Sequence, residues 1–538
     1  MRRKSVLFFA FLIFSLVGFS QVARPKLVVG LVVDQMRWDY LYRYSDLYGN
    51  GGFKRLLKEG FSSENNFIPY MPTYTAVGHS CIYTGSVPAI TGIVGNNWYD
   101  KAANKNVYCT DDSTVSTVGN NGKAGKMSPA NMWTTTITDE LRLSNNFKSK
   151  VIGIALKDRG SILPAGHSAN AAYWYDGGKW ISSTHYMDAL PGWVNKFNDK
   201  DVAGAYMKTD WNTLLPIEKY DLSTADDKPY ETSIKGEKTV TFPHKLSAID
   251  AGNKYESFRT TPFANTFTFD FAKAAIESER LGKNTVTDFL AISISSTDYV
   301  GHSFGPNSIE IEDTYLRLDK DIESFLNYLD KTVGKGNYTL FLSADHGVAH
   351  VPAFLKEHKI PAGTFDDADI LKELNRKIEE KFAVKTAVKT VMNYQVYLND
   401  KNIAEQNKSK DEIIDFVIDR LKEKDFIINA FELDEVMEAA LPAPQREMMI
   451  NGYNPKRSGD IEFTFKSGYF DGGTKGTTHG LWNPYDAHIP LLWYGWGIKK
   501  GKTNRETFMT DIAPTLAALL HIQMPSGSTG APIPEVLK

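Results

Sequence analysis

The sequence contains little cysteine, with only Cys81 and Cys109 among 538 residues. Two cysteines exclude a disulfide scaffold, so burial of apolar side chains must hold the fold together. A surplus of one charge is also missing, because 61 Lys and Arg stand against 64 Asp and Glu. Without a basic surplus the chain lacks the positive field that binds a phosphate backbone, so we expect no specific nucleic-acid partner. Glycine (41) and proline (23) are not enriched, which excludes collagen-like and low-complexity architectures.

Long hydrophobic runs are absent beyond the first twenty residues. Three cations at positions 2–4 precede an apolar and small-residue stretch over 5–19, which is typical of a secretory signal peptide. We therefore predict a signal peptide over 1–20, a secreted or periplasmic location, and no membrane span after its removal. Cleavage changes the formal net charge from −3 to −6, because three cations and no anions are lost. An uncleaved anchor is the alternative, and Cys81 and Cys109 either pair or remain buried thiols.

Short apolar runs followed by amphipathic helical stretches recur along the chain. This alternation predicts an α/β fold, with a central, mostly parallel sheet and helices on both faces. The clearest expected strands are 27–33, 151–156, 289–295, 338–343 and 489–493, and the clearest helices are 309–329 and 510–520.

Two regions break this alternation. Residues from about 160 to 250 are rich in Tyr, Trp, Gly and Asn and predict a loop-rich insertion. Residues from about 365 to 445 contain two charged amphipathic helices, 366–382 and 408–424, and predict a small α+β insertion. We expect one large domain, 21–538, that carries both.

Acidic residues and histidines follow several of the predicted strands. Ligands of an open α/β sheet bind beyond the carboxyl ends of its strands, so these positions are candidates for a site. The candidates are Asp34, Asp298, His302, Asp345, His346 and His479. Each alone is more typical of a turn, a helix cap or a solvated pair. Together, six oxygen and nitrogen donors without a thiolate suit two zinc ions with three protein ligands each and open positions, which indicates catalysis.

Thr75 is the candidate nucleophile. It follows a loop and begins an apolar helical stretch, and a helix start favours an anion such as phosphate. Coordination to zinc removes the hydroxyl proton that makes threonine a poor nucleophile. Thr73 competes for this role, and a simple helix cap is the other explanation of Thr75. His79, one turn further, is interpreted as structural.

The ordered set of motifs resembles the alkaline phosphatase superfamily. The motifs of this set are Asp34, Thr75-x-x-x-His79, Thr84-Gly85, Gly92-x-x-x-Asn96, Asp298-x-x-x-His302, Asp345-His346-Gly347 and His479. The resemblance implies two zinc ions per chain, with Thr75 between them. One site would comprise Asp298, His302 and His479, and the other Asp34, Asp345 and His346.

Within the superfamily, Thr75 and its spacing to His79 look like the nucleotide pyrophosphatase and phosphodiesterase branch. Lys157 and Arg159 instead resemble the phosphate-irrepressible periplasmic alkaline phosphatases, which use a Lys and an Arg in place of a magnesium site. Two residues apart on an extended backbone, both side chains would point the same way and bind a phosphate dianion. A surface pair that ends a strand is the alternative. The sulfatase maturation signal is absent from the sequence.

The expected function is that of an exported, zinc-dependent alkaline phosphatase acting on small-molecule phosphate monoesters. Thr75 would form a phosphothreonine, while Asn96, Lys157 and Arg159 would bind the non-bridging oxygens. The alternatives are a phosphodiesterase or nucleotide pyrophosphatase of the same superfamily, and a non-catalytic binding protein with the same fold. The physiological substrate stays open, and so does the oligomeric state, with a monomer favoured.

Overall fold

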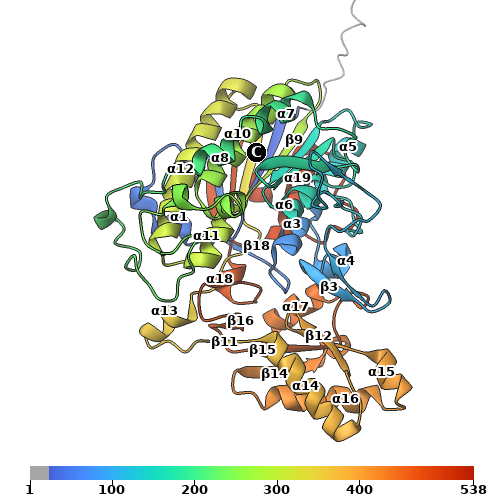
Figure 1. Ribbon diagram of the computed structural model, residues 1–538. Helices are drawn as coiled ribbons and strands as arrows, with labels where there is room; N and C mark the ends of the chain where they lie inside the picture. The colour runs from blue at the N-terminus through green and yellow to red at the C-terminus, as the bar shows by residue number, and fades with distance from the viewer. Residues whose placement is uncertain (1–22) are drawn as a thin grey trace, which may run out of the picture.

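The computed structural model describes residues 23–538, so the predicted signal peptide lies outside the described residues. A ten-stranded sheet forms the centre of the molecule (Figure 1). Its strands are, in spatial order, β18 (Gly501–Phe508), β2 (Phe61–Phe67), β17 (Leu491–Gly495), β10 (Tyr338–Ser343), β1 (Leu27–Val33), β9 (Asp288–Ile294), β6 (Val151–Ala155), β7 (Ala171–Asp176), β8 (Lys179–Ser183) and β5 (Thr117–Val118). The five strands from β10 to β7 run parallel, whereas β17 and β8 are antiparallel to their neighbours. The predicted α/β class is confirmed.

The central strands are covered on both faces. Every residue of β1, β6, β9 and β10 is buried, which explains why these strands appear in the sequence as continuous apolar runs. The main covering helices are α3 (Thr75–Thr84), α6 (Asp158–Ala165), α10 (Phe263–Ser278), α11 (Ser296–Phe304), α12 (Ile309–Leu329) and α19 (Ile512–Leu520).

The element predictions for the core are confirmed, with small shifts at the ends. The bounds of β1, β10 and α12 match to the residue, whereas β6 ends one residue earlier than expected and β9 begins and ends one residue earlier. The last expected strand begins two residues later, as β17. The last expected helix divides into a 3-10 turn, Met509–Asp511, and α19.

The loop-rich region begins later than expected. Instead of loop from about residue 160, the chain forms α6 and then β7 and β8 of the central sheet. The aromatic side chains there are buried rather than exposed in a loop: Trp180 stacks on Phe267 and Phe271 at 5.1 and 4.3 Å between ring centroids. Aromatic packing conceals the strand pattern. Loops with short helices then run over 184–262.

The second insertion forms the orange lobe below the main body in Figure 1. Its four-stranded sheet has the order β12 (Val388–Met392), β13 (Gln395–Leu398), β15 (Ile461–Phe465) and β14 (Ile427–Glu432). Helices α14 (Asp367–Phe382) and α16 (Lys410–Lys422) help to bury a separate apolar core. The lobe extends past the expected end near 445, because α17 (Ala443–Gly452) separates β15 from its partner strands in the sequence.

Two smaller points follow from the structure. Cys81 and Cys109 are free, buried thiols, so of the two alternatives, a disulfide or buried thiols, the structure has the second. Within residues 23–538, no helix is long and apolar enough to cross a bilayer.

Candidate metal centre and nucleophile

Six side chains with metal-binding chemistry lie together beyond the carboxyl ends of β1, β9 and β10. They form two groups: Asp298, His302 and His479, and Asp34, Asp345 and His346. In each group, one ligand atom of every residue lies within 4.8 Å of the others. The register of the parallel strands causes this convergence, since Val33 in β1 pairs with Ile294 in β9. The structure therefore brings the six predicted donors together in the two predicted sets of three.

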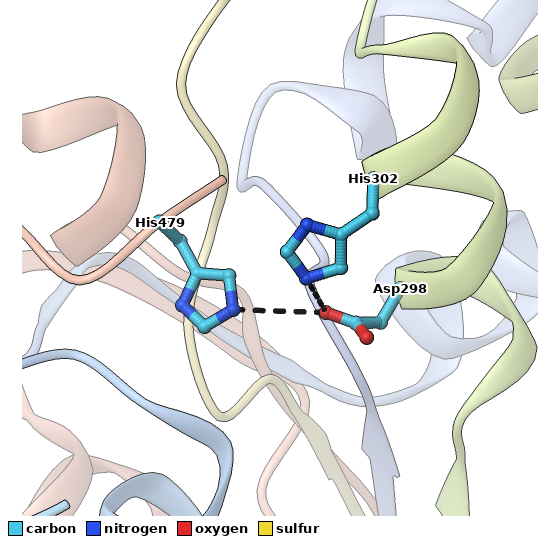
Figure 2. A group of neighbouring side chains, drawn as sticks. All are labelled: Asp298, His302 and His479. Carbon is cyan, nitrogen blue, oxygen red and sulfur yellow. Dashed lines mark ion pairs between the residues drawn. The ribbon is translucent and has the colours of Figure 1, made fainter. Parts of the chain in front are cut away.

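The first group combines one helix with a distant loop. Figure 2 shows Asp298 and His302 projecting from α11, one helical turn apart, while His479 approaches from the opposite side. Both imidazoles direct Nε2 toward Oδ1 of Asp298, at 3.1 Å for His302 and 3.8 Å for His479. Three ligand atoms from separate segments thus surround one point.

The second group is fully buried. Nε2 of His346 lies 3.5 Å from Oδ1 of Asp34 and 3.4 Å from Oδ2 of Asp345. These two carboxylate oxygens accept no hydrogen bond from the described residues. Nδ1 of His79 also lies 3.3 Å from Oδ2 of Asp345. A buried carboxylate oxygen that accepts no hydrogen bond is costly, so this donor set fits a bound cation.

Backbone carbonyls fix the orientation of all three imidazoles. The Nδ1 contacts are His302 to the Thr477 carbonyl at 2.7 Å, His346 to the Gly347 carbonyl at 2.9 Å, and His479 to the Thr73 carbonyl at 2.7 Å. A carbonyl only accepts, so Nδ1 carries a proton, and in the neutral imidazole the lone pair of Nε2 faces the carboxylates. Metal-binding histidines are held in this way.

The electrostatics of the site point to a shortage of positive charge. Burial, reinforced by the charges of Asp298 and Asp345, raises the pKa of Asp34 well above its usual range. Burial also opposes ionisation of Asp298, but His302 and Lys157 outweigh it and hold the pKa of Asp298 well below its usual range. The carboxylates compete for too few cations. Divalent ions at the two groups would supply the missing charge.

Thr75 contacts the second donor group and Lys157. Its Oγ1 is 3.3 Å from Nε2 of His346 and 3.4 Å from Nζ of Lys157. It is the first residue of α3, and its side chain does not cap the helix. Oγ1 of Thr73 instead donates to the carbonyl of Leu481 at 3.1 Å. The side chain of Thr75, and not that of Thr73, therefore contacts the site.

Lys157 is buried inside the same site. Its Nζ lies 2.7 Å from Oδ2 of Asp34 and 2.5 Å from Oδ2 of Asp298, so it contacts one carboxylate of each group. These ion pairs raise its pKa against the effect of burial, so the amine is charged.

Arg159 does not share the geometry of Lys157, and the expected extended backbone over both residues is wrong. Lys157 is extended, but α6 begins at Asp158, so Arg159 already lies in the first helical turn. Its Nη1 donates to the hydroxyl of Tyr108 at 3.0 Å, and that hydroxyl donates to Asp158 at 2.5 Å. Asn96 lies beside the start of α3, where its Oδ1 accepts a hydrogen bond from the Ala76 amide at 2.9 Å.

Residues beneath the site complete it. His79 contacts the carbonyl of Thr75 through Nδ1 at 2.8 Å and Ser293 through Nε2 at 2.9 Å, which is a structural position. The sequence reasoning missed Tyr108, which β4 (Lys105–Tyr108) brings to Arg159, and Gln35. Gln35 had a signal in the sequence, because it directly follows a strand that ends in a candidate ligand.

Comparison with known proteins places the chain in a family. The model of the type I phosphodiesterase / nucleotide pyrophosphatase family matches residues 28–486. A protein of Myroides odoratus named calcium-transporting ATPase is 57% identical, over 98% of this chain and 97% of its own. Alkaline phosphatase PhoV of Synechococcus elongatus is 55% identical, over 96% of this chain and 94% of its own. Alkaline phosphatase PafA of Elizabethkingia meningoseptica is 53% identical, over 96% of this chain and 95% of its own.

The fold is similar to a solved structure over almost its whole length. The crystal structure of wild-type alkaline phosphatase PafA superposes with a TM-score of 0.94 at 53% sequence identity. The match covers 96% of this chain and 100% of that one. The central sheet and the lobe therefore belong to one shared architecture.

Proposed function

This chain belongs to the type I phosphodiesterase / nucleotide pyrophosphatase family, and we infer from its site that it is an alkaline phosphatase, a phosphoric monoester hydrolase. It converts phosphate monoesters to inorganic phosphate and an alcohol. The observation that carries this function is the position of Thr75, whose hydroxyl lies beside His346 of one donor group and beside Lys157, which contacts Asp298 of the other group.

We propose two Zn²⁺ per chain as the cofactors. Asp298, His302 and His479 would hold one ion, and Asp34, Asp345 and His346 the other, with Thr75 next to both. Three of these six donors are imidazole nitrogens, which suit zinc, whereas calcium prefers six to eight oxygen ligands. The name of the Myroides relative therefore does not guide our choice of metal.

The proposed reaction has two displacements at phosphorus. Bound zinc supplies Lewis acidity, which favours the ionised hydroxyl and stabilises charge on the leaving oxygen. Oγ1 of Thr75 attacks phosphorus in line, the alcohol departs, and a phosphothreonine results. Water then cleaves the phosphothreonine and releases phosphate. Asn96, Lys157 and Arg159 bind the non-bridging oxygens throughout, which is electrostatic preorganisation.

A phosphodiesterase of the same family is the second candidate, since the matching family model carries that description. A buried, charged lysine next to Thr75 favours the dianionic group of a monoester over a diester. Hydrolysis of an aryl phosphate monoester and of its methyl diester by the purified protein separates the two functions. We expect faster turnover of the monoester, and faster turnover of the diester would overturn the proposal.

A non-catalytic binding protein is tested by replacing Thr75 with Gly. We expect zinc binding to persist while hydrolysis is lost. Unchanged hydrolysis in this variant would show that Thr75 is not the nucleophile.

We also propose export and a single catalytic domain. The predicted signal peptide over 1–20 supports export, and a mature chain that begins near residue 21 in a secreted or periplasmic fraction is the expected result. Residues 21–538 would form one domain, because β17 and β18 return from the lobe to the central sheet.

A further inference from the structure

Gln35 has an unusual backbone conformation at a sensitive position. It follows Asp34 directly after β1 and is only 2% exposed. Its φ of 65° lies in the left-handed region, which residues other than glycine rarely adopt. Such strain persists only where the surrounding structure requires it, and it is common at functional sites.

The left-handed turn directs two hydrogen-bond donors of Gln35 toward different groups of candidate metal ligands. Its backbone N–H donates to Oδ1 of Asp345 at 3.1 Å. Its side-chain Nε2 donates to Oδ1 of Asp298 at 2.9 Å. Asp345 belongs to one group of three and Asp298 to the other. One residue thus holds a carboxylate in each of the two groups.

Gly301 makes room for this arrangement. It lies in α11 between Asp298 and His302, and a Cβ at this position would collide with Oε1 of Gln35. The amide oxygen therefore packs against the helix, while Nε2 faces the carboxylate. This orientation is also the only one in which the amide can donate to a carboxylate.

We propose that Gln35 is a positioning residue that orients one carboxylate in each metal site, and that Gly301, which has no side chain, leaves room for its amide. The proposal rests on the proposed function, because the two donor groups must bind metal. Oδ1 of Asp298 faces both His302 and His479, so the amide of Gln35 fixes the oxygen that would complete that site. Loss of such an outer partner typically weakens metal binding by about 10- to 100-fold.

Replacing Gln35 with Gly separates the side-chain contact from the backbone contact. Glycine adopts φ near 65° without strain and keeps the N–H donor to Asp345, but it lacks the amide that reaches Asp298. Zinc affinity is measured by competition with a fluorescent chelator, which gives two dissociation constants per chain. We expect one constant to weaken by about 10- to 100-fold and the other to change by less than about twofold.

Gly301→Ala tests the same contact from the other side. Alanine favours a helix, so the variant keeps its fold, but the methyl group must displace the amide of Gln35. We expect the same single constant to weaken. Gly192→Ala is the matched control, because a Cβ there meets no atom within 4 Å.

The outcomes of this experiment are distinct. If both zinc dissociation constants equal those of the wild type in Gln35→Gly and also in Gly301→Ala, the positioning role is overturned. Equal weakening of both affinities, together with a lower melting temperature, would also overturn it, because a general structural defect would then explain the loss. A wild-type protein that does not bind two zinc ions would instead overturn the proposed function.

Discussion

Replacement of Lys157 by Met is the most informative test of substrate recognition. Methionine is unbranched like lysine and keeps most of its apolar stem, but it lacks the terminal ammonium and its charge. The Nζ of Lys157 lies 3.4 Å from Oγ1 of Thr75, so a phosphoryl group that approaches Thr75 comes within reach of the ammonium. Lys157 is 5% exposed, so little water is present to replace it.

The size of the effect follows from the lost interaction. A hydrogen bond to a charged group contributes about 1.5–3 kcal/mol. At 1.36 kcal/mol per tenfold, kcat/KM for a monoester dianion should fall roughly 10- to 150-fold. Because Coulomb attraction scales with charge, a diester monoanion should lose about half of this free energy, a roughly 3- to 12-fold fall. The ratio of monoester to diester activity should therefore also fall by roughly 3- to 12-fold.

The assay compares an aryl phosphate monoester with its methyl diester, using wild-type and variant protein of equal zinc content. Equal zinc content matters because Lys157 also contacts Asp34 and Asp298. Lys150→Met is the matched control, since Lys150 pairs with Glu279 at 2.9 Å and contacts none of the site residues. Equal losses on both substrates would refute the reasoning, because Lys157 would then not recognise the second negative charge.

Three further predictions concern the metal, the nucleophile and the loop-rich region. A chelator should abolish hydrolysis and lower the melting temperature, because the buried carboxylates lose their countercharge. Added zinc should restore the activity and the melting temperature. Full activity without metal would contradict the proposal. Thr75→Ser should retain measurable activity, whereas Thr75→Gly should lose more than roughly 10³-fold in kcat, and mass spectrometry should detect phosphothreonine in acid-quenched wild type. Burial opposes protonation of His244, but Glu237 and Glu310 outweigh it and raise its pKa from 6.5 to about 9. The protonated imidazole therefore adds stability that is complete below about pH 6.5 and is lost as pH rises through 9, about 3 kcal/mol in total. His244→Gln should flatten this part of the melting-temperature profile, whereas the exposed His358→Gln should not; the same slope in both variants would show that His244 is not responsible.

The sequence predicts the core of the fold because its strands are buried on both faces. A strand such as β1 has no polar side chain within it, and it ends at Val33, directly before the polar residue Asp34. The strands β7 and β8 were missed for the opposite reason. Their aromatic residues pack against α10, a contact between distant segments that no local pattern contains. The extent of the lobe was missed in the same way, because β15 pairs with strands far from it in the sequence.

The candidate ligands were predictable, but the geometry around them was not. Residues that follow parallel strands gather at one edge of the sheet, which is a rule of topology and needs no coordinates. The separate orientations of Lys157 and Arg159 depend on α6 starting at Asp158, a boundary that varies by one or two residues in any assignment. The role we propose for Gln35 depends on a left-handed φ at a residue that is not glycine, and residue type alone does not predict that conformation.

The two carboxylates that contact Lys157 explain how a metal centre and an ammonium share one site. Asp34 directs Oδ1 toward His346 and Oδ2 toward Lys157. Asp298 directs Oδ1 toward His302 and His479, and Oδ2 toward Lys157. Because each carboxylate uses a different oxygen for each task, a cation bound among the histidines need not displace the lysine. The arrangement requires two aspartates that face each other across one ammonium, and adjacent parallel strands in register, β1 and β9, provide it. With divalent ions bound in both donor groups, a chain with a net negative charge would present a positive, buried site to a phosphate dianion beside Lys157 and Thr75.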